Sequence, residues 1–123
     1  MAGIHSVAAH HSTTMFDYSS KLTVDGTGKE LRWVNPHVSL LIFGTTQAND
    51  EPTDWLLETT SPSVLVRLGW SRTSLKPGDR VRAQINPLRD TEQHGGTLDA
   101  VTLVESGKTF GTNNREQERP NLD

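Results

Sequence analysis

The sequence predicts an all-β protein, a small five-stranded antiparallel OB-like barrel with one short helix between the third and fourth strands. Three observations carry this prediction. Apolar residues alternate with polar ones over short segments, which is typical of half-buried strands. The single helix signal falls after the third such segment, which is the layout of the OB-fold. The chain has 123 residues and no cysteine, so one domain without disulfides is expected.

The first two strands are predicted on either side of an Asn-Pro pair. The segment "KLTVDGTGKELRWV" (21–34) alternates around a kink expected near Gly26–Gly28. Asn35-Pro36 then interrupts the pairing, because proline has no N–H to donate. The next segment, "HVSLLIFGT" (37–45), is apolar at both odd and even positions. We therefore expect a central strand that is buried on both faces.

The third strand and the helix follow directly. "WLLETT" (55–60) is the strand, and "SPSVLVRLGW" (61–70) is the helix. Ser61 is a good N-cap, Pro62 suits the first helical position, and Gly69 can end the helix in a left-handed conformation. The helix should therefore connect the third strand to the fourth.

The fourth and fifth strands complete the barrel. "RVRAQI" (80–85) alternates cleanly, and "TLDAVTLV" (97–104) follows a polar, glycine-containing loop. The predicted domain is 19–110. An N-terminal arm that carries histidines (1–18) precedes it, with 1–9 interpreted as the remnant of a leader or of a recombinant extension. A polar tail (111–123) follows it.

Charge and hydropathy exclude two kinds of partner. The net charge is −3 and the basic residues do not cluster, whereas nucleic-acid binding is driven by neutralisation of phosphates. No apolar run approaches the roughly 18 residues of a membrane span. We expect neither a nucleic-acid partner nor a membrane span.

Two predicted loops and the N-terminal arm carry histidines. In an OB-fold, the loops after strands one and four border the usual binding site, and here they are Asn35–His37 and Pro87–Gly96. In the arm, His10 and His11 are neighbours, and imidazole is a good ligand for copper and zinc. The pair could equally be solvated. His94, in the second loop, is interpreted as solvated.

His37 and two carboxylates form the second candidate set. If Asn35-Pro36 makes the turn, His37 is available as a metal ligand or as a general base near neutral pH. Alternatively, its side chain packs or bonds to a backbone carbonyl. Glu58 shares a strand face with Leu56 and either faces solvent or, if it points inward, pairs with His37 or Arg67. Asp17 is a further carboxylate that could orient His37.

The remaining candidates could line a ligand site. Trp33 and Trp70 could form its apolar walls, although tryptophans more often pack in the core or at a rim. Asn35 lies on the predicted rim loop. Arg67 lies on the helix and either contacts a ligand or pairs with a surface acid.

The ordered motifs "AHHS…MFD", "GTGKELRWVNPHV", "WLLETTSPSVLVRLGWSRTSLKPGDRV" and "LDAVTLVESGKTF" resemble a family of small exported bacterial proteins known as DUF6152. The matching positions are His10, His11, Ser12, Phe16, Asp17, Trp33, Asn35, Pro36, His37, Glu58, Ser61, Pro62, Gly69 and Trp70. Thr59-Thr60 departs from the small residues expected there, and Thr13 replaces a common aromatic. The resemblance implies periplasmic export and a small β-barrel, with the polar positions gathered at one site and the arm folded near His37. It implies no function.

Three functions remain open. The first is an exported, periplasmic or secreted binding module for a copper or zinc ion, with His10, His11 and His37 as ligands. The second is a small cofactor-free enzyme of the isomerase, lyase or hydratase type, in which His37 and Glu58 or Asp17 act on a small organic molecule. The third is a module that recognises a peptide or glycan along the second strand. No cofactor beyond copper or zinc is implied.

Overall fold

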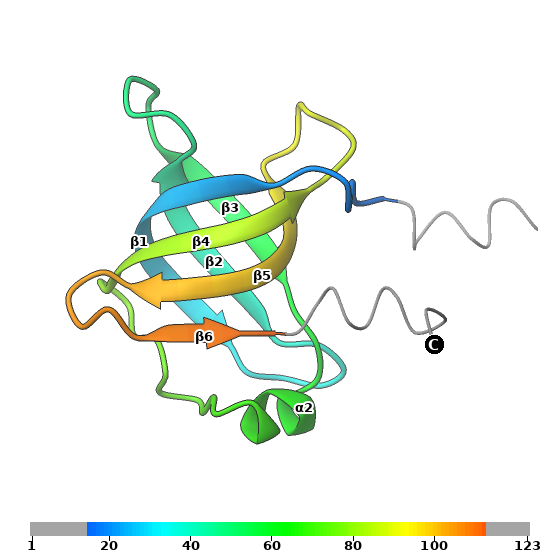
Figure 1. Cartoon of the computed structure of the whole chain (residues 1–123), viewed down its shortest axis with the longest axis vertical. Helices are drawn as coiled ribbons and strands as arrows, with labels where there is room; N and C mark the ends of the chain where they lie inside the picture. The colour runs from blue at the N-terminus through cyan, green and yellow to red at the C-terminus, as the bar shows by residue number, and fades with distance from the viewer. Residues whose placement is uncertain (1–14, 113–123) are drawn as a thin grey trace, which may run out of the picture.

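A computed structural model describes residues 15–112. Its strands form one sheet in the order β3-β2-β1-β4-β5-β6, and β3 also pairs with β5, so that five strands close into a barrel (Figure 1). The elements are β1 (Leu22–Arg32), β2 (Ser39–Thr45), β3 (Thr53–Glu58), α2 (Pro62–Arg67), β4 (Arg80–Pro87), β5 (Gly95–Leu103) and β6 (Thr109–Gly111). The predicted OB-like barrel with one short helix between the third and fourth strands is confirmed.

One pairing in the barrel is parallel, which differs from the wholly antiparallel barrel that was predicted. Leu56 of β3 lies opposite Gly95 of β5, and Glu58 lies opposite Thr97, with both strands running the same way. The reason is geometric: strands that alternate in direction around a closed ring of five must leave two neighbours parallel. The parallel pair closes the barrel.

The interior of the barrel is filled by the alternating apolar positions. Six of the large buried side chains have an exposed fraction of 1% or less: Leu40, Ile42, Leu57, Leu65, Ile85 and Leu98. Their burial supplies most of the favourable free energy of folding, at about 25 cal/mol per Å² of apolar surface. Because these side chains occupy the interior, a ligand site must lie on the outside of the barrel.

The predicted irregularity in β1 is present, and the backbones of β1 and β2 also approach each other closely near it. Gly26 lies opposite Gly44 of β2. A Cβ at residue 26 would lie 2.2 Å from the carbonyl oxygen of Phe43. The β1–β2 register also shifts between Gly28 and Glu30. The bend lets β1 pair with β2 along one part of its length and with β4 along another.

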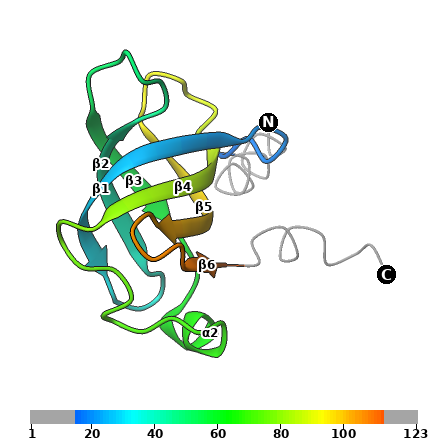
Figure 2. The ribbon, with the colours of Figure 1, turned by 60° about the vertical axis from the view of Figure 1, so that its left-hand side comes forward.

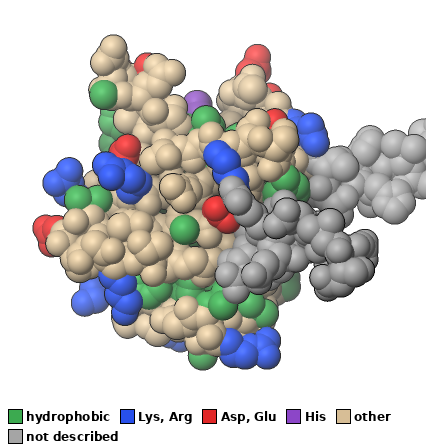
Figure 3. Space-filling model, viewed as in Figure 1, with side chains coloured by type: hydrophobic (Ala, Val, Ile, Leu, Met, Phe, Trp, Pro, Cys, Tyr) green, Lys and Arg blue, Asp and Glu red, His purple; other side chains and the backbone are tan. Residues whose placement is uncertain are grey.

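Helix α2 closes one end of the barrel (Figure 2). Ser61 caps it, because its side chain accepts a hydrogen bond from the Val64 N–H at 3.3 Å. Pro62 is the first helical residue, and Gly69 follows the helix with a φ of +98°. Leu65 points into the core. On the face in Figure 3, the hydrophobic side chains that are visible at the surface lie mainly between the barrel wall and α2.

The expectation that β2 is buried on both faces is wrong. Leu40 and Ile42 point inward and are 1% and 0% exposed, whereas Phe43 on the outer face is 44% exposed. Leu41, also on the outer face, is half-buried beside Leu56 of β3. The reason is that α2 covers an end of the barrel and not this wall. The outer face of β2 and β3 is therefore a partly apolar surface.

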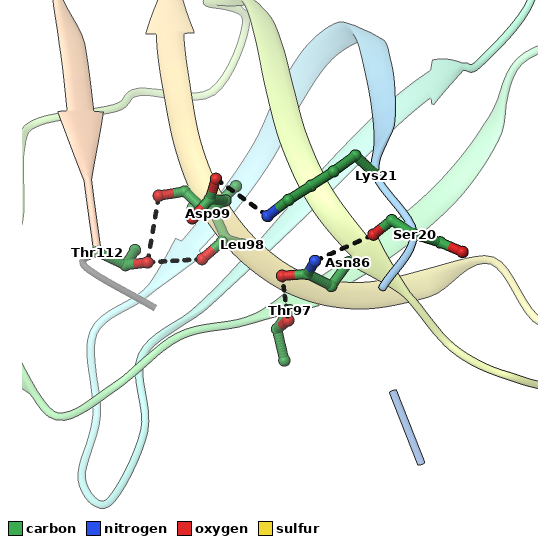
Figure 4. A network of polar contacts seen from close by, with 7 residues as sticks. All are labelled: Ser20, Lys21, Asn86, Thr97, Leu98, Asp99 and Thr112. Atoms are coloured by element: carbon green, nitrogen blue, oxygen red, sulfur yellow. Dashed lines mark hydrogen bonds and ion pairs between the residues drawn. The ribbon is translucent and has the colours of Figure 1, made fainter. Parts of the chain in front are cut away.

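A sixth strand that the sequence did not predict extends the sheet. β6 pairs with β5 and carries the buried Phe110. Beyond it, the Thr112 hydroxyl donates a hydrogen bond to the Leu98 carbonyl at 2.7 Å (Figure 4). In the same network, the Asn86 side-chain amide donates to the Ser20 carbonyl at 3.0 Å. These contacts extend the barrel to Thr112, beyond the predicted boundary at residue 110.

Candidate functional site

A groove of about 370 Å³ lies on the outer wall of the barrel, between β3 and the β4–β5 loop. Hollows around the β5–β6 turn, along β1 and β4, and between the β2–β3 and β4–β5 loops are smaller, at about 210, 280 and 240 Å³. The groove is lined by Met15, Phe16, Leu56, Glu58, Leu88, Gln93, His94, Gly95 and Gly96. We call it the Leu56 groove. Its lining is largely apolar, as is usual for small-molecule sites.

The parallel β3–β5 pair forms the floor of the Leu56 groove. The Leu56 N–H donates to the His94 carbonyl at 3.3 Å, and the Leu88 N–H donates to the Gly95 carbonyl at 3.1 Å. A Cβ at residue 95 would lie 2.9 Å from the Leu56 oxygen and 3.1 Å from Leu88 Cδ1. Because residue 95 is glycine, the Leu56 backbone and the Leu88 side chain can both lie close to it.

The start of the described chain forms one wall of the groove. The Arg89 N–H donates to the Met15 carbonyl, and the Asp17 N–H donates to the Pro87 carbonyl, both at 2.8 Å. Phe16 forms a β-bridge with Leu88 and is 7% exposed, whereas Met15 is 48% exposed. The chain therefore reaches the barrel at the β4–β5 loop, and Met15 presents its thioether side chain to the groove.

Three residues with polar side chains belong to the lining: Glu58, Gln93 and His94. Glu58 is exposed on the outer face of β3 and has no hydrogen-bond or ion-pair partner among the residues that the structure describes. His94 packs edge-on against Trp55, with 5.0 Å between ring centroids. Trp55 is itself held by a hydrogen bond from its Nε1 to the Gly44 carbonyl. The groove thus combines apolar walls with one carboxylate, and His94 lies between it and the neighbouring hollow that Trp55 lines.

The predicted pairing of His37 with Glu58 is absent from the described part of the chain. Figures 1 and 2 place the β1–β2 loop, which carries Asn35 and His37, at the α2 end of the barrel. Both side chains are exposed, and no hydrogen bond or ion pair between His37 and Glu58 occurs within residues 15–112. Glu58 faces outward, which is one of the two orientations that the strand pattern left open.

Asp17 is engaged with its own turn. Its Oδ1 accepts a hydrogen bond from the Ser19 hydroxyl at 2.6 Å, and its Oδ2 accepts one from Ser20 at 2.7 Å. These bonds, first that from Ser19, lower the pKa of Asp17 below its ordinary value, since they favour the charged carboxylate. Asp17 therefore stabilises the approach of the chain to β1, and no described contact joins it to His37.

The tryptophans and the arginine that were predicted to bind a ligand lie apart from the groove. Trp70 is 2% exposed, its Nε1 donates to the Gly111 carbonyl at 2.8 Å, and its ring packs on Phe110. Trp33 is half-buried and packs against the core, and Arg67 is exposed in the last turn of α2. Trp70 in this position supports the fold and presents no surface to a ligand.

The predicted metal ligands His10 and His11 lie outside the described residues. Within residues 15–112, no three His, Asp or Glu side chains are grouped closely enough to hold a metal ion. In the same range, no helix has both the length and the apolar content that crossing a bilayer requires.

Sequence reasoning missed most of the groove. It treated His94 as solvated and did not select Leu88, Gly95 or Gly96. Met15 was not selected either. One signal was available: two consecutive glycines directly after a polar loop and before a strand favour a close backbone approach. That signal does not say which strand approaches.

Comparison with known proteins supports a family assignment and nothing finer. A family model described as "Family of unknown function (DUF6152)" matches residues 1–97. No curated protein and no solved structure matches the chain. The groove is therefore the main guide to function.

Proposed function

The chain belongs to the DUF6152 family, whose function is unknown, and we propose that it is a small exported binding module that holds an organic ligand in the Leu56 groove. The observation that carries the proposal is the groove itself, a hollow of about 370 Å³ on a barrel whose interior is filled by side chains. Its size lies at the lower end of the range for small-molecule sites.

The make-up of the groove favours binding over catalysis. Leu56, Leu88 and Met15 offer apolar contact to a ligand. General acid–base catalysis needs a base within hydrogen-bond reach of its partner group or of the substrate. Neither His94 nor Glu58 has a polar side-chain partner among the described residues. A binding role needs no such pair.

The test uses phenethyl alcohol as an uncharged apolar probe and follows backbone amide shifts by NMR. We expect shifts at Leu56 and its neighbours on the floor of the groove. Leu56→Ser should weaken binding about fivefold or more, because it removes apolar contact worth about 0.8 kcal/mol per buried methylene. Val66→Ser is the matched control: Val66 is 57% exposed, on α2, and Leu56 is 52% exposed. Absence of shifts in the groove, or equal weakening by the two variants, would refute the proposal.

A transition-metal ion is the second candidate. The observation that favours it is that Met15, the first described residue, lines the groove. His11 precedes Met15 by four residues, which span at most about 14 Å of extended chain. Met15 lines the same groove as His94, whereas His37 does not line it. We therefore propose that copper or zinc, if bound, is held by His10 and His11 with His94 as the ligand from the barrel.

Calorimetric titration with Cu(II) and Zn(II) tests the metal site. The double variant His10→Ala/His11→Ala should abolish binding, and His94→Ala should weaken it about tenfold, as loss of one supporting group typically does. His37→Ala should leave the affinity unchanged. If His37→Ala weakens binding and His94→Ala does not, the ligand set predicted from the sequence is the better one.

A further inference from the structure

We infer that the ligand of the Leu56 groove is a small organic cation, with an apolar body and an amine or similar positive group directed at Glu58. This inference rests on the proposed function and adds the chemical class of the ligand to it. Two observations support it. Glu58 carries the negative charge of the groove lining, and it has no hydrogen-bond or ion-pair partner among the described residues.

The charge within the lining of the groove is negative. Among the nine lining residues, Glu58 is the only carboxylate, and there is no lysine or arginine. Arg89 follows the lining residue Leu88 in the chain, and its positive charge lies near the Asp17 carboxylate. Two pairs of opposite charges lie on the nearby strands β1 and β3. Lys29 binds Asp54 at 3.1 Å, and Arg32 binds Glu30 at 3.3 Å. Glu58 is thus left as a carboxylate that a ligand can neutralise.

The lining beside Glu58 suits the body of such a ligand. Leu56 lies two residues before Glu58 on the same outer face of β3, so the two side chains project side by side. Met15 and Leu88 complete the apolar wall, and a polarizable thioether adapts well to ligand shape. A ligand that buries a hydrocarbon body against Leu56 therefore brings its head group close to the Glu58 carboxylate. A cation is attracted there, and an anion is repelled.

The experiment compares three probes that share one body: phenethylamine, phenethyl alcohol and hydrocinnamate. Affinities are measured from amide shifts at low salt. We expect the amine to bind about fivefold more tightly than the carboxylate, with the alcohol between them, and the difference to shrink as ionic strength rises. In Glu58→Gln, the amine and the carboxylate should bind within about twofold of each other.

Glu105→Gln is the control for net charge, because it removes one exposed carboxylate in the turn after β5, outside the groove lining. It should keep the preference for the amine. If the alcohol binds in the groove but the wild-type protein does not prefer the amine, the cation class is refuted and the proposed function stands. Equal loss of the preference in Glu58→Gln and Glu105→Gln also refutes it. If no probe shifts the groove amides, the proposed function itself fails.

Discussion

Trp70→Ala will lower the free energy of unfolding by about 3 to 5 kcal/mol, the usual cost of deleting a large buried aromatic side chain. Trp70 is 2% exposed, and its ring centroid lies 5.3 Å from that of Phe110. It joins the segment after α2 to β6, which are far apart in the sequence. Urea unfolding followed by circular dichroism measures the effect, because this signal does not depend on the tryptophan that is removed.

Two further variants separate the causes of that loss. Trp70→Phe keeps most of the ring but loses the Nε1–Gly111 hydrogen bond of 2.8 Å, so we expect about 1 to 2 kcal/mol. Trp33→Ala should cost less than Trp70→Ala, because Trp33 is only half-buried. A loss below about 1 kcal/mol for Trp70→Ala would contradict the structural role assigned to it.

Gly26→Ala will also destabilise the barrel strongly, by about 3 kcal/mol. The added Cβ would lie 2.2 Å from the Phe43 oxygen and 2.5 Å from the Gly44 Cα. Both are backbone atoms of the paired strand, so neither can rotate away as a flexible side chain would. To accommodate the methyl group, β1 and β2 must separate where β1 bends. Urea unfolding monitored by tryptophan fluorescence gives the free energy.

Gly28→Ala is the matched control, two residues further along the same strand. Its Cβ would meet the Lys76 and Asp79 carbonyl oxygens at 3.7 and 3.8 Å, which are ordinary contact distances. Replacing glycine by alanine where there is room also reduces the entropy of the unfolded chain. We therefore expect a change below about 1 kcal/mol. Similar losses for Gly26→Ala and Gly28→Ala would show that close backbone approach is not the cause.

Much of the fold could be predicted because its signals are local. Alternation of apolar and polar residues indicated most of the five barrel strands, and a continuous apolar segment indicated β2. The Ser61-Pro62 pair marked the start of α2. The glycines of β1 marked its bend. The β6 strand escaped prediction because only three residues form it and its stability depends on contacts with β5 and Trp70.

The candidate site could be predicted only in part, since it depends on contacts between distant segments. Glu58 was selected from an apolar strand, but the sequence left two orientations open, and the structure shows that it faces outward. His37 was favoured because an Asn-Pro turn precedes it. His94 lies instead in the groove, because the β4–β5 loop packs beside β3 and next to Met15. Such neighbours are separated by tens of residues, and no local pattern encodes them.

Periodicity, capping and motifs are properties of short segments. They were sufficient to predict five of the six strands, the position of α2, the OB-like order of elements and the family. Two features depended on the tertiary structure. One is which wall of the barrel is left uncovered by α2, and the other is which histidine lines the same groove as Glu58. The burial of Trp70 also depended on the tertiary structure. The physical reason is that the barrel closes through the parallel β3–β5 pair. This pair brings together two segments that are far apart in the sequence, and the Leu56 groove forms where they meet.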